Sequence, residues 1–393
     1  MHYLKFMSFH LMGLFTLAAL TLGQFYIVLG YAIWLLFYIG GDIVLGDDDS
    51  TPSYAHHSIM TWQLWLALPL LMAILFVFSW HFATTDIWGY GQWITELTGY
   101  DALAAKANTS WYQQLVLVAF TGLVIGVIGT VTGHELVHRT WHKMSYTIGR
   151  WLLAFSFDAN FAIEHVYGHH RFVCTAQDPA SAPRGRNVYQ HIIVSSWYGN
   201  ISAWNIEKRR LSVKSLPIFS RHNRALRGIA MSLVILLAVF ALGSWQALAF
   251  FIPTALWAKA TLEIVNYMEH YGLVRANGTK VAPRHSWNTN KRISSWSLFN
   301  LTRHSHHHAQ AQVPYHRLAP YEGAPMMISG YLATLGLTLI PPLWHRLMLP
   351  RLAHWDTHFA NEDEKVLAQQ ANDASGIAAY QQMHQVETGS IPA

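Results

Sequence analysis

Long apolar segments alternate with short polar ones over the first two thirds of the chain. Four of them stand out because they lack Asp, Glu, Lys and Arg, and their apolar parts cover residues 7–41, 60–83, 111–133 and 228–258, the last continuing past Lys259 to about 267. One membrane-spanning helix needs roughly 20 apolar residues. Segments 60–83 and 111–133 therefore each predict one crossing, whereas each of the two longer segments has room for one tilted helix or a hairpin of two.

The distribution of basic residues decides between these two possibilities. All but two of the 26 Lys and Arg residues lie in 134–227 and 259–393, and the exceptions are Lys5 and Lys106. Basic segments stay on the cytoplasmic side, so an even number of crossings must separate the two stretches, and a further even number must separate Lys5 from residue 134. We therefore predict hairpins that turn near Gly23–Gln24 and Gly243–Ser244, and an all-α polytopic membrane protein with six transmembrane helices.

Composition supports the membrane class and defines the remaining segments. Only 12% of the residues are charged and 52% are hydrophobic, whereas a soluble chain carries about 25% charged residues. We expect one membrane-embedded domain over residues 1–361, with an interfacial segment at 340–350, and a frayed polar tail over 362–393. The basic residues lie in loops next to the predicted spans, so lipid and an acidic protein explain them better than nucleic acid.

Histidine and cysteine counts restrict the chemistry. The chain has 24 His and a single Cys, Cys174. A lone cysteine excludes disulfide scaffolds, zinc ribbons and protein-bound iron–sulfur clusters, so any metal is held by imidazole. Four groups of histidines lie at or beyond the predicted span ends, in the sequences GHELVHR (134 and 138), EHVYGHH (165, 169 and 170), NYMEHYG (270) and LTRHSHHHA (304, 306, 307 and 308).

The number of these histidines favours two metal ions. A structural zinc needs four ligands and a catalytic zinc three, and nine or more histidines exceed both. Imidazole suits Zn, Cu, Fe and Ni, so ligand type alone does not choose the metal. Two alternatives remain open: HELVH matches the HExxH pattern of an intramembrane zinc protease with Glu135 as base, and a metal transporter would place its ligands within the spans. The protease explains only two of the histidines, and the transporter does not fit histidines that lie at span ends and in loops.

These four motifs, in this order, resemble those of the integral-membrane alkane monooxygenases, within the wider membrane desaturase and hydroxylase superfamily. Asp178-Pro179 and the sequence HSWN at 285–288 are similar to further family features. The resemblance implies nine iron ligands: His134, His138, His165, His169, His170, His270, His304, His307 and His308. Ligating imidazoles usually donate their other N–H to a carboxylate or carbonyl, and the candidates for that role are Glu135, Glu164, Asp178 and Glu269.

The resemblance also implies the activity. Such proteins are non-haem diiron enzymes of the bacterial cytoplasmic (inner) membrane, with the histidine motifs on the cytoplasmic side. They use O₂ to convert the terminal methyl of a hydrophobic substrate, here most simply an n-alkane dissolved in membrane lipid, to a primary alcohol. Because this chain lacks a cysteine quartet and a dinucleotide-binding motif, the electrons are expected from a rubredoxin- or ferredoxin-type carrier and its NAD(P)H reductase.

Three departures leave the substrate open. Arg139 replaces the usual Lys, and the ending IPPLW with Trp355-Asp356 is closer to xylene monooxygenase, which oxidises an aromatic methyl. His306 stands where alkane hydroxylases have Asp. We expect it either to take no part in the site or to contact a ligating histidine without binding metal itself. Hydroxylation of aromatic methyl groups and desaturation of fatty-acyl chains therefore stay as alternatives.

Overall fold

The computed structural model describes residues 2–383, and it is built almost entirely of helices. Within those residues, sheet structure is limited to two isolated bridges, Asp47 with Lys291 and Asn288 with Met326. Among residues 2–383, five helices are long and apolar enough to cross a membrane. They contain η1 (His2–Met7) with α1 (Ser8–Leu22), α2 (Gln24–Leu45), α3 (His57–Trp65) with α4 (Ala67–Phe82), α7 (Trp111–Val124) with η3 (Ile125–Val131) and α8 (Thr132–Val137), and α13 (Arg224–His270).

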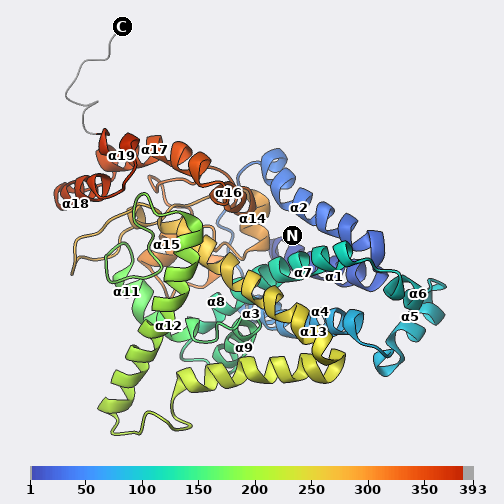
Figure 1. Ribbon diagram of the computed structural model, residues 1–393. Helices are drawn as coiled ribbons and strands as arrows, with labels where there is room; N and C mark the ends of the chain where they lie inside the picture. The colour runs from blue at the N-terminus through green and yellow to red at the C-terminus, as the bar shows by residue number, and fades with distance from the viewer. Residues whose placement is uncertain (1, 384–393) are drawn as a thin grey trace.

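The longest of these helices is bent back on itself. The backbone of α13 leaves the helical region at Ser244, whose φ is 63° and ψ −166°. Figure 1 shows the two arms of α13 meeting there in a V. Gly243 lies at the turn because a Cβ at this position would come within 2.6 Å of the carbonyl oxygen of Ser79. The chain breaks similarly between α1 and α2 at Gly23, whose φ of 68° is the left-handed conformation that favours glycine.

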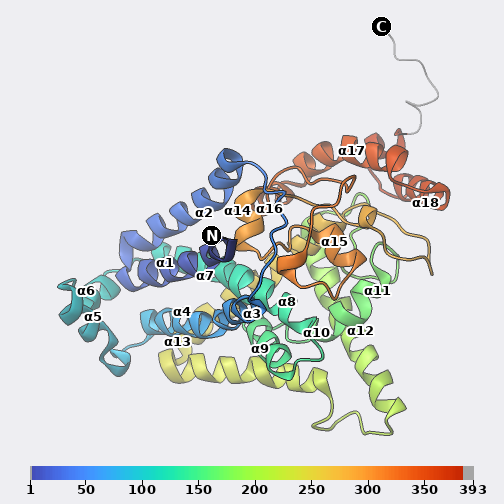
Figure 2. The ribbon, with the colours of Figure 1, turned by 180° about the vertical axis from the view of Figure 1, so that it is seen from behind.

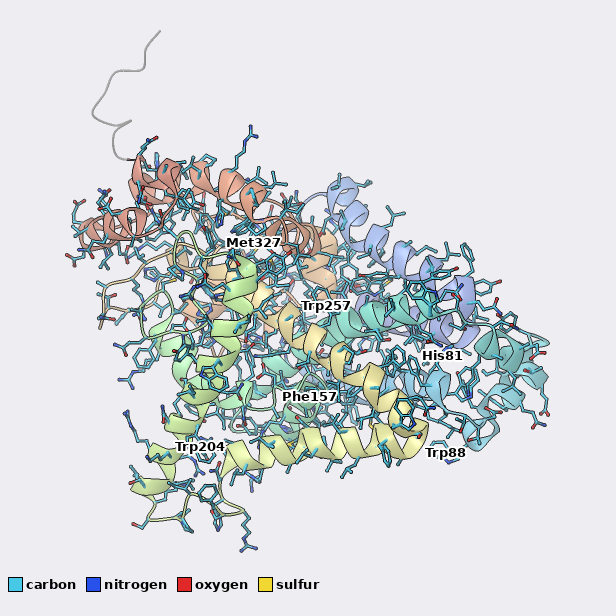
Figure 3. All side chains as sticks on the ribbon, in the orientation of Figure 1. His81, Trp88, Phe157, Trp204, Trp257 and Met327 are labelled. Carbon is cyan, nitrogen blue, oxygen red and sulfur yellow. The ribbon has the colours of Figure 1, made fainter. Side chains whose placement is uncertain are left out.

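Small residues bring the central helices close together. A Cβ added to Gly122 of α7 would lie 2.6 Å from the ring of Trp257 on the second arm of α13, and one added to Gly133 of α8 would lie 2.8 Å from Leu153. Trp257 is labelled in Figure 3, where that arm passes α7. Close backbone approach at small residues is how helices associate inside a membrane. This packing fixes the end of α8, where the first two motif histidines lie.

The histidine motifs lie at one end of the helix bundle. Figures 1 and 2 show α15 and α11 at this end, whereas α5 and α6 lie at the opposite one. The segments at the α5–α6 end are η2 (Ile87–Gly89), α5 (Tyr90–Thr98) and α6 (Ala102–Ala107). Those at or near the histidine end are α9 (Lys143–Ala154), α10 (Phe161–Glu164), η4 (His165–His169), α11 (His170–Phe172), α12 (Val188–Val213), η5 (Pro283–His285), α14 (Arg292–Ser297), α15 (His304–Ala309) and η6 (Tyr315–Arg317).

The C-terminal region is packed onto this end, so the expectation of a frayed tail is wrong for residues 362–383. After α16 (Tyr331–Thr338), the helices α17 (Pro341–His358), α18 (Glu362–Asp373) and α19 (Ala378–Gln381) follow. Asn361 and Glu364 form a capping box that starts α18, and Glu364 is only 1% exposed. The remainder of the expected tail, 384–393, lies outside the described residues.

Candidate metal centre

The nine histidines expected to bind metal come together in two groups, and no other residue joins either group among residues 2–383. We name them the five-histidine group (His134, His138, His165, His170 and His307) and the four-histidine group (His169, His270, His304 and His308). Within each group the potential ligand nitrogens all lie within 4.8 Å of one another. The family resemblance implied these nine residues, but not their division into two sets.

Helix geometry explains that division. η4 is a stretch of π-helix, in which residues five apart are hydrogen-bonded neighbours. His165 and His170 therefore face the same way, with their Nε2 atoms 3.1 Å apart, while His169 turns toward the other group. In α15 the spacing is that of an α-helix, so His304 and His308 meet with Nε2 atoms 2.9 Å apart.

In the five-histidine group the ring nitrogens converge on one small space. The Nε2 atom of His165 lies 3.0 Å from that of His138, and the Nε2 atoms of His307 and His170 are 3.1 Å apart. The fifth ring, His134, lies with its centre 4.4 Å from that of His165 and 4.7 Å from that of His307. Its Nε2 atom is buried without a hydrogen-bond partner.

The four-histidine group has the same arrangement. His308 is central, with its Nε2 atom 3.3 Å from that of His169 and 2.9 Å from that of His304. The ring centre of His270 lies 4.9 Å from that of His169 and 4.8 Å from that of His308. The Nε2 atom of His270 is also buried and unpaired.

These contacts fit bound metal ions better than hydrogen bonds between rings. Two facing imidazole nitrogens cannot both carry a proton, and two bare nitrogens repel each other. Metal ions bind imidazole nitrogen at about 2.0–2.1 Å, so two ligands at right angles around one ion are about 3 Å apart. The observed Nε2 separations of 2.9–3.3 Å match that spacing. Both groups therefore fit one ion each.

Burial keeps most of these rings in the form that binds metal. Desolvation, followed by the neighbouring imidazoles, holds the pKa values well below the usual value for His165, His170, His304, His307 and His308. Neutral imidazole is the ligand form of histidine. His169 differs from these five rings: burial acts to lower its pKa, but Asp178 outweighs burial and raises that pKa above its usual value.

Asp178 holds His169 in place, as the sequence analysis expected for this carboxylate. Nδ1 of His169 donates to Oδ2 of Asp178 over 2.9 Å, and the hydroxyl of Ser181 donates to the same oxygen over 2.6 Å. Burial acts to raise the pKa of Asp178, but His169 and Ser181 outweigh it and hold that pKa below its usual value. The carboxylate fixes the tautomer of His169 that leaves Nε2 bare toward His308.

Changing Asp178 to Asn should weaken metal retention without unfolding the chain. Replacing a carboxylate that orients a ligating histidine typically costs 10- to 100-fold in metal affinity. We expect iron to dissociate about tenfold faster into a chelator, as measured on purified protein. The exposed Asp363→Asn variant is the control, and equal iron retention in the two variants would contradict this role for Asp178.

Glu269 contacts the inner nitrogen of a histidine in the four-histidine group, not an outer one. Its Oε2 is 3.1 Å from Nε2 of His304, the nitrogen that faces the other histidines, and its Oε1 accepts from the hydroxyl of Tyr331 over 2.5 Å. The sequence analysis expected this carboxylate to accept from the outer nitrogen of a ligand. It instead borders the space into which the four nitrogens point.

The two remaining carboxylates do not touch the rings in the way expected. Among the hydrogen bonds of residues 2–383, neither Glu135 nor Glu164 is bonded to any of the nine histidines. Glu135 pairs with Arg139 at 2.9 Å, an i,i+4 pair that the sequence already contained. Burial, and after it the nearby Asp178, raises the pKa of Glu164 to about 8.

Two further residues complete the surroundings. His306 belongs to neither group, and its Nδ1 accepts from the backbone N–H of Ala319 over 2.8 Å. The backbone carbonyl of His285 accepts from Nδ1 of His270 over 3.0 Å and from the buried thiol of Cys174 over 3.1 Å. The sequence analysis missed this carbonyl because side-chain chemistry does not reveal a backbone acceptor; the HSWN sequence was the only signal.

Comparison with known proteins identifies the family. A model of the family described as fatty acid desaturase matches residues 109–327, which include all nine histidines. The chain belongs to the fatty acid desaturase family. Within this desaturase family, it is 38% identical over 266 residues to alkane 1-monooxygenase 1 of Pseudomonas aeruginosa, a match that covers 66% of this chain and 69% of the relative.

Two further relatives are named for different substrates. Alkane 1-monooxygenase of Ectopseudomonas oleovorans is 28% identical over 347 residues, 83% of this chain and 79% of its own length. The xylene/toluene monooxygenase hydroxylase component of Pseudomonas putida is 32% identical over 253 residues, 64% of this chain and 68% of its own. The chain is thus a multi-pass membrane oxidoreductase of the alkane monooxygenase and desaturase family, with a histidine-rich non-haem metal site.

Proposed function

We propose that this protein is a diiron monooxygenase that hydroxylates the terminal methyl of a hydrophobic substrate, most simply an n-alkane, to a primary alcohol. The observation that carries the proposal is the division of nine histidines, seven of them buried and two half-buried, into groups of five and four. One ion cannot use nine nitrogen ligands, whereas two ions with four or five ligands each can. Iron held in this way would supply the binding and reductive activation of O₂.

The overall reaction sets what the rest of the protein has to provide. One oxygen atom of O₂ enters a C–H bond of the methyl group and the other leaves as water, so each turnover consumes two electrons and two protons. The apolar helices offer a membrane-dissolved substrate access without passage through water, and the burial of the histidine groups excludes bulk water from the site. We propose six crossings, counting the two arms of α13 separately, in the bacterial cytoplasmic membrane with the histidine end toward the cytoplasm.

The zinc-protease alternative fits the geometry poorly. In an HExxH protease the two histidines bind one zinc with a third ligand, and the glutamate acts on the bound water. Here His134 and His138 lie among three further histidines. Glu135 is turned to Arg139 and also lies 3.5 Å from the backbone N–H of Tyr315, so it is not available as that base.

Aromatic methyl hydroxylation is the second candidate. It is favoured by the relative named as a xylene/toluene monooxygenase component and by Arg139, which replaces the lysine usual in alkane hydroxylases. Arg139 donates to Glu135 over 2.9 Å and to the hydroxyl of Thr61 over 3.0 Å. Both substrates require insertion of oxygen at a methyl group, so the two candidates share a reaction and differ in the shape of the substrate.

One experiment tests both candidates. Purified protein is analysed for metal, reconstituted with a rubredoxin and its reductase, and supplied with octane, p-xylene and a stearoyl substrate. We expect two irons per chain and 1-octanol as the main product. 4-Methylbenzyl alcohol as the main product would favour the aromatic candidate, an alkene would favour desaturation, and zinc with peptide cleavage would overturn the proposal.

Electrons have to arrive from another protein. Cys174 is the only cysteine of the chain and it is buried, so it cannot hold an iron–sulfur cluster. A groove of about 1630 Å³ opens between α12, the segment around Asp178 and α18, which Figure 1 shows on the same side of the molecule. Its lining includes eight basic and two acidic side chains. We propose this groove as the docking surface for an acidic rubredoxin- or ferredoxin-type carrier.

The position of the groove suits that role. Asp178 lies in its lining and is hydrogen-bonded to His169, so a docked carrier is one residue away from the four-histidine group. Several lining arginines are already paired inside the protein, such as Arg184 with Asp356 and Arg224 with Glu207. The exposed Arg209 and Lys214 of the same lining remain at the surface for a partner.

Reversing the charge of these two residues should weaken the carrier interaction. For the double variant Arg209→Glu, Lys214→Glu we expect the KM for the carrier to rise about tenfold at low salt, because complementary charge mainly speeds association. The difference should shrink as salt shortens the range of the attraction. The exposed Arg221→Glu, outside the groove lining, is the control, and an unchanged KM in the double variant would contradict docking there.

A further inference from the structure

The C-terminal helices hold one side of the candidate metal centre. We call residues 341–383, which contain α17, α18 and α19, the C-terminal strap. It lies beyond residues 109–327, the part matched by the desaturase family model. Figure 1 shows it in red across the histidine end of the molecule.

One anchor of the strap reaches the segment next to His270. Arg184 pairs with Asp356 of α17 and donates from Nη1 to Oδ1 of Asn372 in α18 over 2.6 Å. The Nε–H of the same arginine donates to the carbonyl oxygen of Gly272 over 2.9 Å. Gly272 is two residues after His270, so this anchor ties α17 and α18 to the end of the motif NYMEHYG.

A second anchor acts on His270 more directly. Oε1 of Glu364 accepts from Nε2 of His285 over 2.7 Å, and both residues are buried. The Nδ1 atom of His285 accepts from the backbone N–H of Ala282 over 3.0 Å. The ring is therefore held at both nitrogens, with its proton on Nε2 toward Glu364. This fixes the backbone of residue 285, whose carbonyl oxygen accepts from Nδ1 of His270 over 3.0 Å.

We infer that Glu364 is a positioning residue for the four-histidine group, acting on His270 through His285. The chain of contacts runs from the carboxylate of α18 to the ring of His285, then through the carbonyl of that residue to the outer nitrogen of His270. It leaves Nε2 of His270 bare and aimed at its three neighbours. The inference rests on the proposed function because it assumes that the four-histidine group binds one of two irons.

The inference makes a selective prediction. Orienting partners of a ligating histidine are typically worth 10- to 100-fold in metal affinity, and Glu364 acts one link further out. In Glu364→Ala we expect one of the two irons to dissociate about tenfold faster into a chelator, while the other keeps its rate. With ⁵⁷Fe, Mössbauer spectra of the partly depleted variant should lose one component and retain the other.

Three variants separate positioning from a general loss of structure. Glu364→Gln keeps an oxygen that can accept from His285, so it should retain iron better than Glu364→Ala. Arg284→Ala removes another side-chain partner of Glu364, at 2.7 Å, but keeps the contact with His285, and it should hold both irons normally. His285→Ala combined with Glu364→Ala should lose iron no faster than the worse single variant, because both act through one path.

The outcomes distinguish this inference from the proposed function. Wild-type protein that binds no iron would contradict the proposed function. Wild-type protein with two irons, and Glu364→Ala with two irons released at wild-type rates, would overturn only the inference. Two other results would also overturn it: equally faster release of both irons in Glu364→Ala, or the same loss of iron in Arg284→Ala. In either case the strap would stabilise the whole site and not the four-histidine group alone. Glu362→Gln, exposed on the same helix, is the matched control.

Discussion

Replacing His169 with Ala is expected to abolish turnover and to reduce bound iron from two per chain to one or fewer. His169 supplies a nitrogen to the four-histidine group, with its Nε2 3.3 Å from that of His308. Its Nδ1 also donates a hydrogen bond to Oδ2 of Asp178 over 2.9 Å. Loss of a ligand should exceed the 10- to 100-fold effect that is typical of losing a residue that only orients one. Product formation should therefore fall by more than about 100-fold, with iron counted on the same purified sample.

The matched control lies within the same set of motifs. His306 stands between His304 and His307 but belongs to neither histidine group, so His306→Ala should keep two irons and most of the activity. Both variants should insert into the membrane and elute like wild type in detergent. If His169→Ala keeps full activity, or if His306→Ala loses as much iron as His169→Ala, the assignment of the ligands is wrong.

The second large effect concerns stability. Changing Lys259 to Met is expected to destabilise the protein by roughly 3–5 kcal/mol, because removal of one partner from a buried ion pair leaves an uncompensated charge. Nζ of Lys259 lies 2.6 Å from Oδ2 of Asp158 and 2.5 Å from Oε1 of Glu263. Phe157, labelled in Figure 3, lies directly before Asp158, in the turn between α9 and α10. Loss of the lysine therefore loosens α13 from the segment that leads into η4.

Neutralising the two carboxylates that pair with Lys259 should restore the stability lost in Lys259→Met. The triple variant Lys259→Met, Asp158→Asn, Glu263→Gln has no uncompensated charge, and its thermal midpoint in detergent should recover toward wild type. Lys208→Met, at an exposed position of α12, controls for the loss of a lysine. A midpoint unchanged in Lys259→Met, or a triple variant less stable than the single one, would contradict the argument.

The sequence predicted the apolar helices for a physical reason, whereas the nine clustered histidines were expected from the family resemblance of their motifs. Spans are recognisable because the membrane excludes charge, and histidines at helical spacing are recognisable because one helix face brings them together. The assignment of His169 and His170 to different groups was not predictable, because it depends on the π-helical turn of η4.

The supporting contacts were harder to predict. Asp178 was expected to hold a ligand and is hydrogen-bonded to His169, whereas Glu135 was expected to do the same and pairs with Arg139. Both are acidic residues in or near a histidine motif. Which of them reaches a ligating ring depends on the direction of the backbone at each position, which the sequence does not show. The burial of Glu364 was hidden by the polar, Gln- and Ala-rich sequence around it, because its partner His285 lies 79 residues away in the chain.

The sharing of segments between the two histidine groups has a mechanical consequence. Residues 165–170 contribute to both groups, and so do residues 304–308. A displacement of either segment therefore moves ligands of both ion positions in the same direction. The separation of two ions bound there would therefore be fixed by these two short helices, and both histidine groups would move together when either segment moves.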